Sequence, residues 1–144
     1  MGFGEAVRSF FNRYADFQGR SRRAEYWWVY LFNFMVVMGL MIIAFLPGSI
    51  NYATGEPGPI YFVLVGAIFL YMLATFIPGL ALMVRRLHDV NLSGWILLGA
   101  LVPLVNILVG LGVFIVCFIP GTAGPNKYGP DPKNPVGLNA DIFA

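Results

Sequence analysis

Charged side chains are scarce in this chain of 144 residues, since nine Lys and Arg and seven Asp and Glu make up 11% of it. A typical soluble domain carries about 25% charged residues, and the hydrophobic fraction here is 58%. So short a soluble domain could not cover that much apolar surface, and disorder requires low hydrophobicity with high charge. The composition therefore predicts an integral membrane protein.

Other features that the sequence does not have exclude several classes of function. A single cysteine, Cys117, cannot form an intrachain disulfide, and a net charge of +2 gives no argument for nucleic acid as a partner. The sequence has no Gly-rich phosphate loop, nucleophile elbow or paired-cysteine motif. We therefore expect no nucleic-acid partner, no cofactor and no enzymatic activity.

Three long stretches without charge predict an all-α, polytopic transmembrane helix bundle. A membrane-spanning helix needs about 20 apolar residues, which places the spans at residues 27–46, 60–84 and 95–119. Pro47 and Gly48 end the first span, and Pro78 predicts a kink in the second. The second helix is expected to continue through residues 85–89, since no breaker precedes Asn91.

The third apolar segment is interrupted by Pro103 and Asn106. Neither half alone is long enough to cross a bilayer. The segment is therefore one kinked span or a re-entrant pair of half-helices, and in either case protein or water must shield the broken backbone. We favour three full spans. Ser93 is a candidate N-cap for this segment.

An amphipathic helix is predicted ahead of the first span, over residues 3–18. Its aromatic and aliphatic side chains recur at steps of three and four residues, while charged side chains fill the other side. A Phe-rich helix of this kind is expected to lie in the headgroup interface; the alternative is a helix that packs on the bundle.

A turn-rich stretch follows Ile119 and cannot form a regular helix. Residues 1–132 are expected to form a single membrane domain, with residues 133–144 as a tail. The many turn residues predict that residues 120–129 fold back onto the bundle.

The distribution of Lys and Arg predicts the orientation. The segment before the first span holds five arginines, the loop at residues 47–59 holds no Lys or Arg, and the next loop holds Arg85 and Arg86. By the positive-inside rule the N-terminus is cytoplasmic. A third full span would place Lys127 and Lys133 outside, whereas a re-entrant segment would keep them inside.

Two polar clusters then fall at the cytoplasmic interface, residues 19–27 and 85–95. Helical spacing allows contacts between Arg85 and Asp89, between Arg86 and Asp89, and between Arg85 and His88. The candidate polar network consists of Arg20, Arg22, Glu25, Arg85, Arg86, His88 and Asp89.

The charges of the two clusters do not balance. Their five arginines include Arg23, and with two carboxylates they leave an excess of about three positive charges. Phospholipid phosphates are the nearest anions, and the planar guanidinium binds phosphate bidentately. One interpretation is a pocket for anionic headgroups; the simpler one is a positive-inside anchor with incidental lipid contact.

His88 is the single histidine of the chain. A histidine beside an aspartate is more often a structural, hydrogen-bonded group than a catalyst. With Asp89 and Glu25 it makes a weak metal site, so no metal is expected. An enzyme acting on lipid with His88 and Asp89 as general base is the least favoured interpretation, because no nucleophile accompanies the pair.

Three ordered motifs resemble a known family, the DUF805 family of small bacterial inner-membrane proteins. They are Phe17-x-Gly19-Arg20-x-Arg22-x-x-Glu25-Tyr26-Trp27, then Arg85-Arg86-Leu87-His88-Asp89-x-x-x-Ser93-Gly94-Trp95, then Pro120-Gly121-x-x-Gly124-x-Asn126-x-Tyr128-Gly129. The resemblance implies a multi-span protein of the bacterial inner membrane with no established activity. It also implies that the charged residues of the first two motifs act as one functional or architectural unit.

The leading hypothesis is a non-enzymatic inner-membrane protein whose network of Arg, Glu, His and Asp holds the bundle together and engages anionic phospholipid. The alternative is a small transporter or channel subunit in which the broken third segment lines a pathway. Such a subunit would have to form a homo-oligomer or join another membrane partner.

Overall fold

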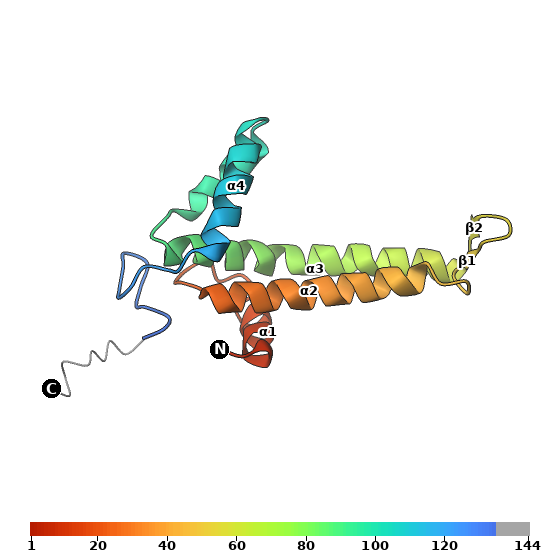
Figure 1. Ribbon diagram of the computed structural model, residues 1–144, viewed down its shortest axis with the longest axis horizontal. Helices are drawn as coiled ribbons and strands as arrows, with labels where there is room; N and C mark the ends of the chain where they lie inside the picture. The colour runs from red at the N-terminus through yellow and green to blue at the C-terminus, as the bar shows by residue number, and fades with distance from the viewer. Residues whose placement is uncertain (135–144) are drawn as a thin grey trace. The chain divides into compact units, whose positions relative to one another are not determined.

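The computed structural model describes residues 1–134, which are mostly helical. They divide into two compact units: residues 1–29 together with the described chain from residue 78 onward, and residues 30–77. In chain order the elements are α1 (Phe3–Asn12), α2 (Arg23–Ala44), β1 (Ile50–Asn51), β2 (Glu56–Pro57), α3 (Pro59–Asp89), the 3₁₀-helix η1 (Gly94–Leu101) and α4 (Val105–Phe118) (Figure 1).

Two helices of the described chain, α2 and α3, are long and apolar enough to cross a membrane. They coincide with the first two predicted spans, although α2 begins four residues earlier, at Arg23, and α3 ends five residues later, at Asp89. The predicted continuation of the second helix through its arginines is confirmed. Within the unit of residues 30–77, the hydroxyl of Tyr71 donates to Asn33 Oδ1 at 2.6 Å and joins α3 to α2.

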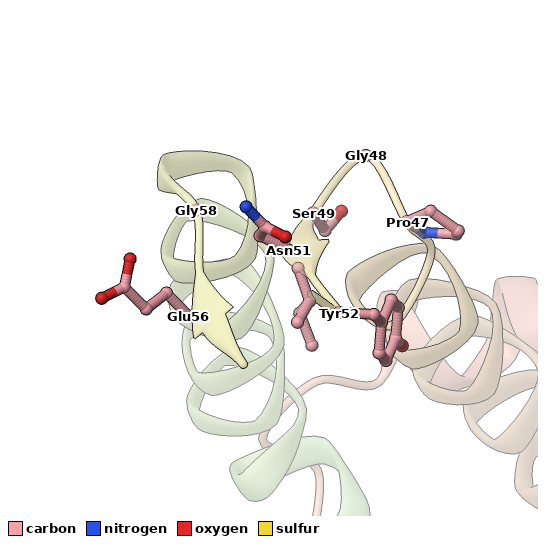
Figure 2. A pocket seen from close by; sticks show the side chains of 8 residues that line it. Pro47, Gly48, Ser49, Asn51, Tyr52, Glu56 and Gly58 are labelled. Atoms are coloured by element: carbon pink, nitrogen blue, oxygen red, sulfur yellow. The ribbon is translucent and has the colours of Figure 1, made fainter. Parts of the chain in front are cut away.

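The loop between α2 and α3 contains a two-stranded antiparallel ribbon, with Ile50 opposite Pro57. It borders a hollow of about 440 Å³, and Figure 2 shows Glu56 pointing away from the other labelled side chains. Polar side chains that line the hollow form hydrogen bonds to nearby backbone carbonyls. Ser49 Oγ donates to the carbonyl of Ile43, and the Tyr52 hydroxyl donates to the carbonyl of Phe45. We therefore assign this hollow no ligand.

Helix α1 ends at Asn12, so the predicted extension to residue 18 is wrong. The reason is local, because Asp16 accepts hydrogen bonds from Arg13 Nε at 2.7 Å and from the backbone N–H of Gln18 at 3.0 Å, which fixes a turn there. One face of α1 is packed: Ala6 and Phe10 are buried in a core with Val29 and Leu82. Phe3 and Phe11 of α1 are exposed, as are Tyr14 and Phe17 beyond its end.

The third apolar segment is not one continuous helix. It forms η1 and then α4, and Figure 1 shows the chain turning between them and returning beside η1. Pro103 and the positive φ of Leu104, 69°, make the turn. Ser93 Oγ accepts from the Trp95 N–H at 3.3 Å, which confirms the predicted N-cap.

Both ends of this apolar hairpin, residues 94–118, lie at the last turns of α3. A Cβ on Gly94 would lie 2.6 Å from Val84 Cγ1, and the carbonyl of Ile119 accepts from Arg86 at 2.5 Å. A continuous span would instead separate its two ends by the thickness of the bilayer. Residues 95–119, predicted as one span, therefore form two short helices that turn back on each other and not one continuous helix. The number of spans stays a prediction.

Candidate functional site, a buried arginine cluster

Asp89 is the centre of the charged cluster. Its Oδ1 accepts from Arg20 Nε at 3.0 Å, and its Oδ2 accepts from Arg86 Nη1 at 2.6 Å. The three side chains are between 1% and 4% exposed. Charge-assisted hydrogen bonds are strong in such surroundings, whereas an unpaired buried charge is costly. One carboxylate therefore holds two guanidiniums, one from Arg20, 69 residues away in the first motif, and one from Arg86, 3 residues away in its own motif.

Arg85 is placed differently, although it adjoins Arg86 in the sequence. Its guanidinium is fully buried and lies 3.9 Å from both Glu25 and Asp16. None of its three nitrogens makes a hydrogen bond within the described residues. Polar contacts of this length commonly include a bridging water. With carboxylates on two sides and no exposed surface, Arg85 is not available to an anionic headgroup.

Glu25 and Asp16 complete the neighbourhood of Arg85. Glu25 is buried and accepts from Ser9 Oγ at 2.8 Å, which ties α1 to the start of α2. Partial burial opposes ionisation of Asp16, but hydrogen bonds from Arg13 and Gln18 and the charges of Arg13 and Arg85 outweigh it. The pKa of the Asp16 carboxyl is therefore lowered, and Asp16 is a carboxylate at neutral pH.

The carbonyl end of α4 lies against this cluster. The last carbonyls of a helix have no intrahelical partner and carry the negative end of its dipole. Here four consecutive carbonyls accept from side chains: Val116 and Ile119 from Arg86, Cys117 from Trp27 and Phe118 from Arg23. The arginines of the first two motifs thus fix the end of the hairpin, and they do so through backbone atoms.

The segment after α4 folds back over the cluster, as predicted. Arg20 donates to the carbonyls of Thr122 and Gly124, and the Thr122 N–H donates to the carbonyl of Asp89 at 2.7 Å. Gly121 packs so closely that a Cβ at this position would overlap the Asp89 carboxylate. Asn126 Nδ2 donates to the carbonyl of His88 at 2.9 Å. Gly121 and Asn126 of the third motif therefore contact Asp89 and His88 of the second motif, which explains why a small residue and an amide stand at these positions.

His88 has a structural role in these contacts. Its Nδ1 lies 3.0 Å from the carbonyl oxygen of Gly19, and since that oxygen can only accept, Nδ1 donates. The ring stacks on Tyr128 with centroids 3.9 Å apart and planes 5° from parallel. Both oxygens of Asp89 are held by arginines, so His88 and Asp89 do not form the dyad that a general base would use. No group of metal-ligating residues occurs in the described part of the chain.

Arg22 is the predicted network residue that stays outside the ion pairs. Its side chain is half-buried, and its Nε has no hydrogen bond within the described residues. The other six predicted residues, Arg20, Glu25, Arg85, Arg86, His88 and Asp89, are brought together. The helical spacing predicted contacts of Arg85 with Asp89 and His88, but the ion pairs of Arg85 among the described residues are with Glu25 and Asp16.

Sequence reasoning missed four contributors: Ser9, Arg13, Asp16 and the Trp27 indole. The amphipathic pattern of residues 3–18 places Asp16 on the polar side of a longer helix, whereas the early end of α1 brings Asp16 within 3.9 Å of Arg85. With Arg13 and Asp16 included, six guanidiniums face three carboxylates, so three positive charges remain in excess. One of these charges lies in the buried centre, where Arg20 and Arg86 share the carboxylate of Asp89. The other two belong to the outer arginines, Arg22 and Arg23, which join no ion pair among the described residues.

The fold and the cluster define a class: a small helical protein with two helices capable of crossing a membrane and a buried arginine cluster that fixes an apolar hairpin. The family model described as "Protein of unknown function (DUF805)" matches residues 14–130. The chain belongs to this family, as the three motifs predicted.

Two curated relatives from Escherichia coli strain K12 are similar over most of their length. "Inner membrane protein YhaI" is 40% identical over 87% of this chain and 92% of the relative. "Inner membrane protein YhaH" is 36% identical over 83% of this chain and 89% of the relative. No solved structure matches this chain.

Proposed function

We propose that this chain is a non-enzymatic, multi-pass protein of the bacterial inner membrane that binds anionic phospholipid headgroups at its cytoplasmic face. The arginine cluster has two parts in this proposal. Arg20 and Arg86 hold the hairpin and the following segment, and Arg85 lies between Glu25 and Asp16. The outer arginines, Arg22 and Arg23, supply the charge that attracts lipid phosphate. The observation that carries the proposal is the excess of three guanidiniums over carboxylates within the arginine cluster.

The position of the two hairpin ends supports a topology in which both face the cytoplasm. The cluster, both hairpin ends and Lys127 belong to one compact unit. With a re-entrant hairpin, the N-terminal segment and both lysines of the last segment face the cytoplasm, in agreement with the positive-inside rule. An α4 of 14 residues is about 21 Å long, short of a hydrocarbon core of about 30 Å. The names of the relatives support the inner membrane as the location.

A substitution of Arg22 can distinguish lipid binding from a structural role in the cluster. It lies within two residues of Arg20 in the first motif, yet its side chain joins no ion pair among the described residues. A basic residue near an anionic membrane contributes about 1 kcal/mol, which corresponds to about fivefold in affinity. Its replacement should therefore weaken lipid binding without loosening the cluster.

Native mass spectrometry of protein purified with phosphatidylglycerol tests the proposal. Arg22→Gln is expected to lower the lipid-bound fraction about fivefold, with an unchanged free energy of unfolding. Lys133→Gln removes the same charge outside the cluster, is the matched control, and should bind within about twofold of wild type. Equal lipid binding by wild type and Arg22→Gln would overturn the proposal.

A second candidate is a transporter or channel subunit, which the broken third segment favours. Broken helices line pathways in many transporters, and this one turns at Pro103 and Leu104. A pathway also needs polar lining, and Asn106 is the one amide, hydroxyl or charged side chain between residues 94 and 119. Cross-linking in native membranes separates the candidates, because a strictly monomeric protein with so few spans cannot enclose a pore.

A further inference from the structure

Arg23 joins the end of the hairpin to the open side of the arginine cluster. Its Nη1 donates to the carbonyl of Phe118 at 2.8 Å, yet its side chain is exposed. The neighbouring carbonyls at this end of α4 are held by Arg86, which is 1% exposed, and by the half-buried Trp27. Of the two arginines that hold this end, Arg23 is therefore the one that a ligand can reach.

The contact with Phe118 uses only part of the guanidinium. Nε and Nη2 form a separate edge, and neither makes a hydrogen bond within the described residues. The two N–H groups of such an edge are parallel and match two oxygens of one phosphate. The Phe118 carbonyl thus orients Arg23 and leaves a bidentate pair of donors for an anion.

The charges around Arg23 favour an anion at that edge. Arg23 lies close enough to Arg86 for the two positive charges to repel each other, because both donate to carbonyls of one helix end. The carboxylate that pairs with Arg86 belongs to Asp89, which also pairs with Arg20. A phosphate on the free edge of Arg23 would therefore neutralise a charge that no carboxylate of the described residues offsets.

We propose that Arg23 couples headgroup binding to the end of α4, with the lipid phosphate on Nε and Nη2 while Nη1 keeps its contact with Phe118. This coupling rests on the proposed function, in which the outer arginines bind lipid phosphate. An arginine that a carbonyl already orients loses less conformational freedom when it binds. Coupling between two equilibria is reciprocal, so bound lipid stabilises the contact with Phe118 by the same factor. Ordering one arginine side chain corresponds to about fivefold.

Amide hydrogen exchange at the end of α4 tests the coupling. The N–H of Ile119 donates to the carbonyl of Ile115 at 3.2 Å, so its exchange reports on the last turn. In wild type, this exchange should be about fivefold slower in bilayer discs of phosphatidylglycerol than in discs of phosphatidylcholine. Arg23→Gln should abolish the difference, although Arg86 and Trp27 still hold the helix end.

Arg8→Gln is the matched control. Arg8 is an exposed arginine of α1, and it makes no hydrogen bond or ion pair to α4 within the described residues. The substitution removes the same charge from the same compact unit, so the fivefold difference in exchange should remain. A difference that Arg8→Gln keeps and Arg23→Gln loses supports the coupling.

The coupling and the headgroup proposal fail in different ways. If wild type retains phosphatidylglycerol in native mass spectrometry but exchanges equally in the two kinds of disc, the coupling is overturned and headgroup binding stands. An Arg23→Gln protein that responds to phosphatidylglycerol as wild type does would also overturn the coupling. Wild type that retains no phosphatidylglycerol would overturn both proposals.

Discussion

Neutralising Asp89 should destabilise this protein more than neutralising any exposed carboxylate. In Asp89→Asn the side chain keeps its shape, but its charge is lost, and an NH₂ replaces one oxygen that faces a guanidinium. Arg20 and Arg86 are each 1% exposed and would remain buried without a counter-ion. Breaking a buried pair in this way costs about 3–5 kcal/mol. Since two pairs share one carboxylate, the loss should reach at least about 3 kcal/mol.

The free energy of unfolding can be measured by titrating the protein from mild detergent into dodecyl sulfate. Tryptophan fluorescence is a suitable signal, because the Trp27 indole donates to the Cys117 carbonyl and its ring packs on Phe118 at 4.8 Å between centroids. Glu56→Gln, an exposed carboxylate in the loop, is the control and should change stability by no more than about 0.5 kcal/mol. An Asp89→Asn protein as stable as that control would refute a shared, buried carboxylate.

Two further predictions concern the segment after α4 and the outer acid. Gly121→Ala should displace that segment from the cluster, because the added methyl group overlaps the Asp89 carboxylate. Limited proteolysis should then cut near residue 125 at least about tenfold faster than in wild type, as expected for a local opening made easier by about 1.4 kcal/mol. An unchanged rate would contradict the contact. Because the pKa of Asp16 is lowered on folding, its contribution to stability is present above its unfolded pKa and is lost as the pH falls through the folded value. Asp16→Asn should remove this loss of stability at acid pH when unfolding is measured as a function of pH. A variant with an unaltered pH profile would contradict the lowered pKa.

The sequence was sufficient to predict the two helices that are long and apolar enough to cross a membrane, because long apolar runs and the absence of charge determine them directly. It also located the motif residues, but not most of their partners. Arg20 and Asp89 are separated by 69 residues, and helical spacing informs only about neighbours on one helix. That spacing correctly predicted the ion pair of Arg86 with Asp89. It also predicted a contact of Arg85 with Asp89, whereas in the folded chain Arg85 pairs with Glu25.

The hairpin shows a second limit of the sequence. Pro103 predicted a break in the helix, but a proline does not determine whether the chain kinks and continues or turns back. The decision lies in tertiary contacts that the local pattern does not contain: the close approach of Gly94 to Val84 and the hydrogen bonds of Arg86 to the end of α4. The charge excess, by contrast, was predictable, because it depends on composition within the motifs and survives the addition of Arg13 and Asp16.

Two measurements on one variant separate the structural role of the buried arginines from lipid binding by the outer ones. For Arg22→Gln, bound phosphatidylglycerol and the free energy of unfolding are measured on the same preparation. We expect about fivefold less bound lipid with stability within about 0.5 kcal/mol of wild type. Undiminished lipid binding, or a loss of stability as large as that expected for Asp89→Asn, would contradict it.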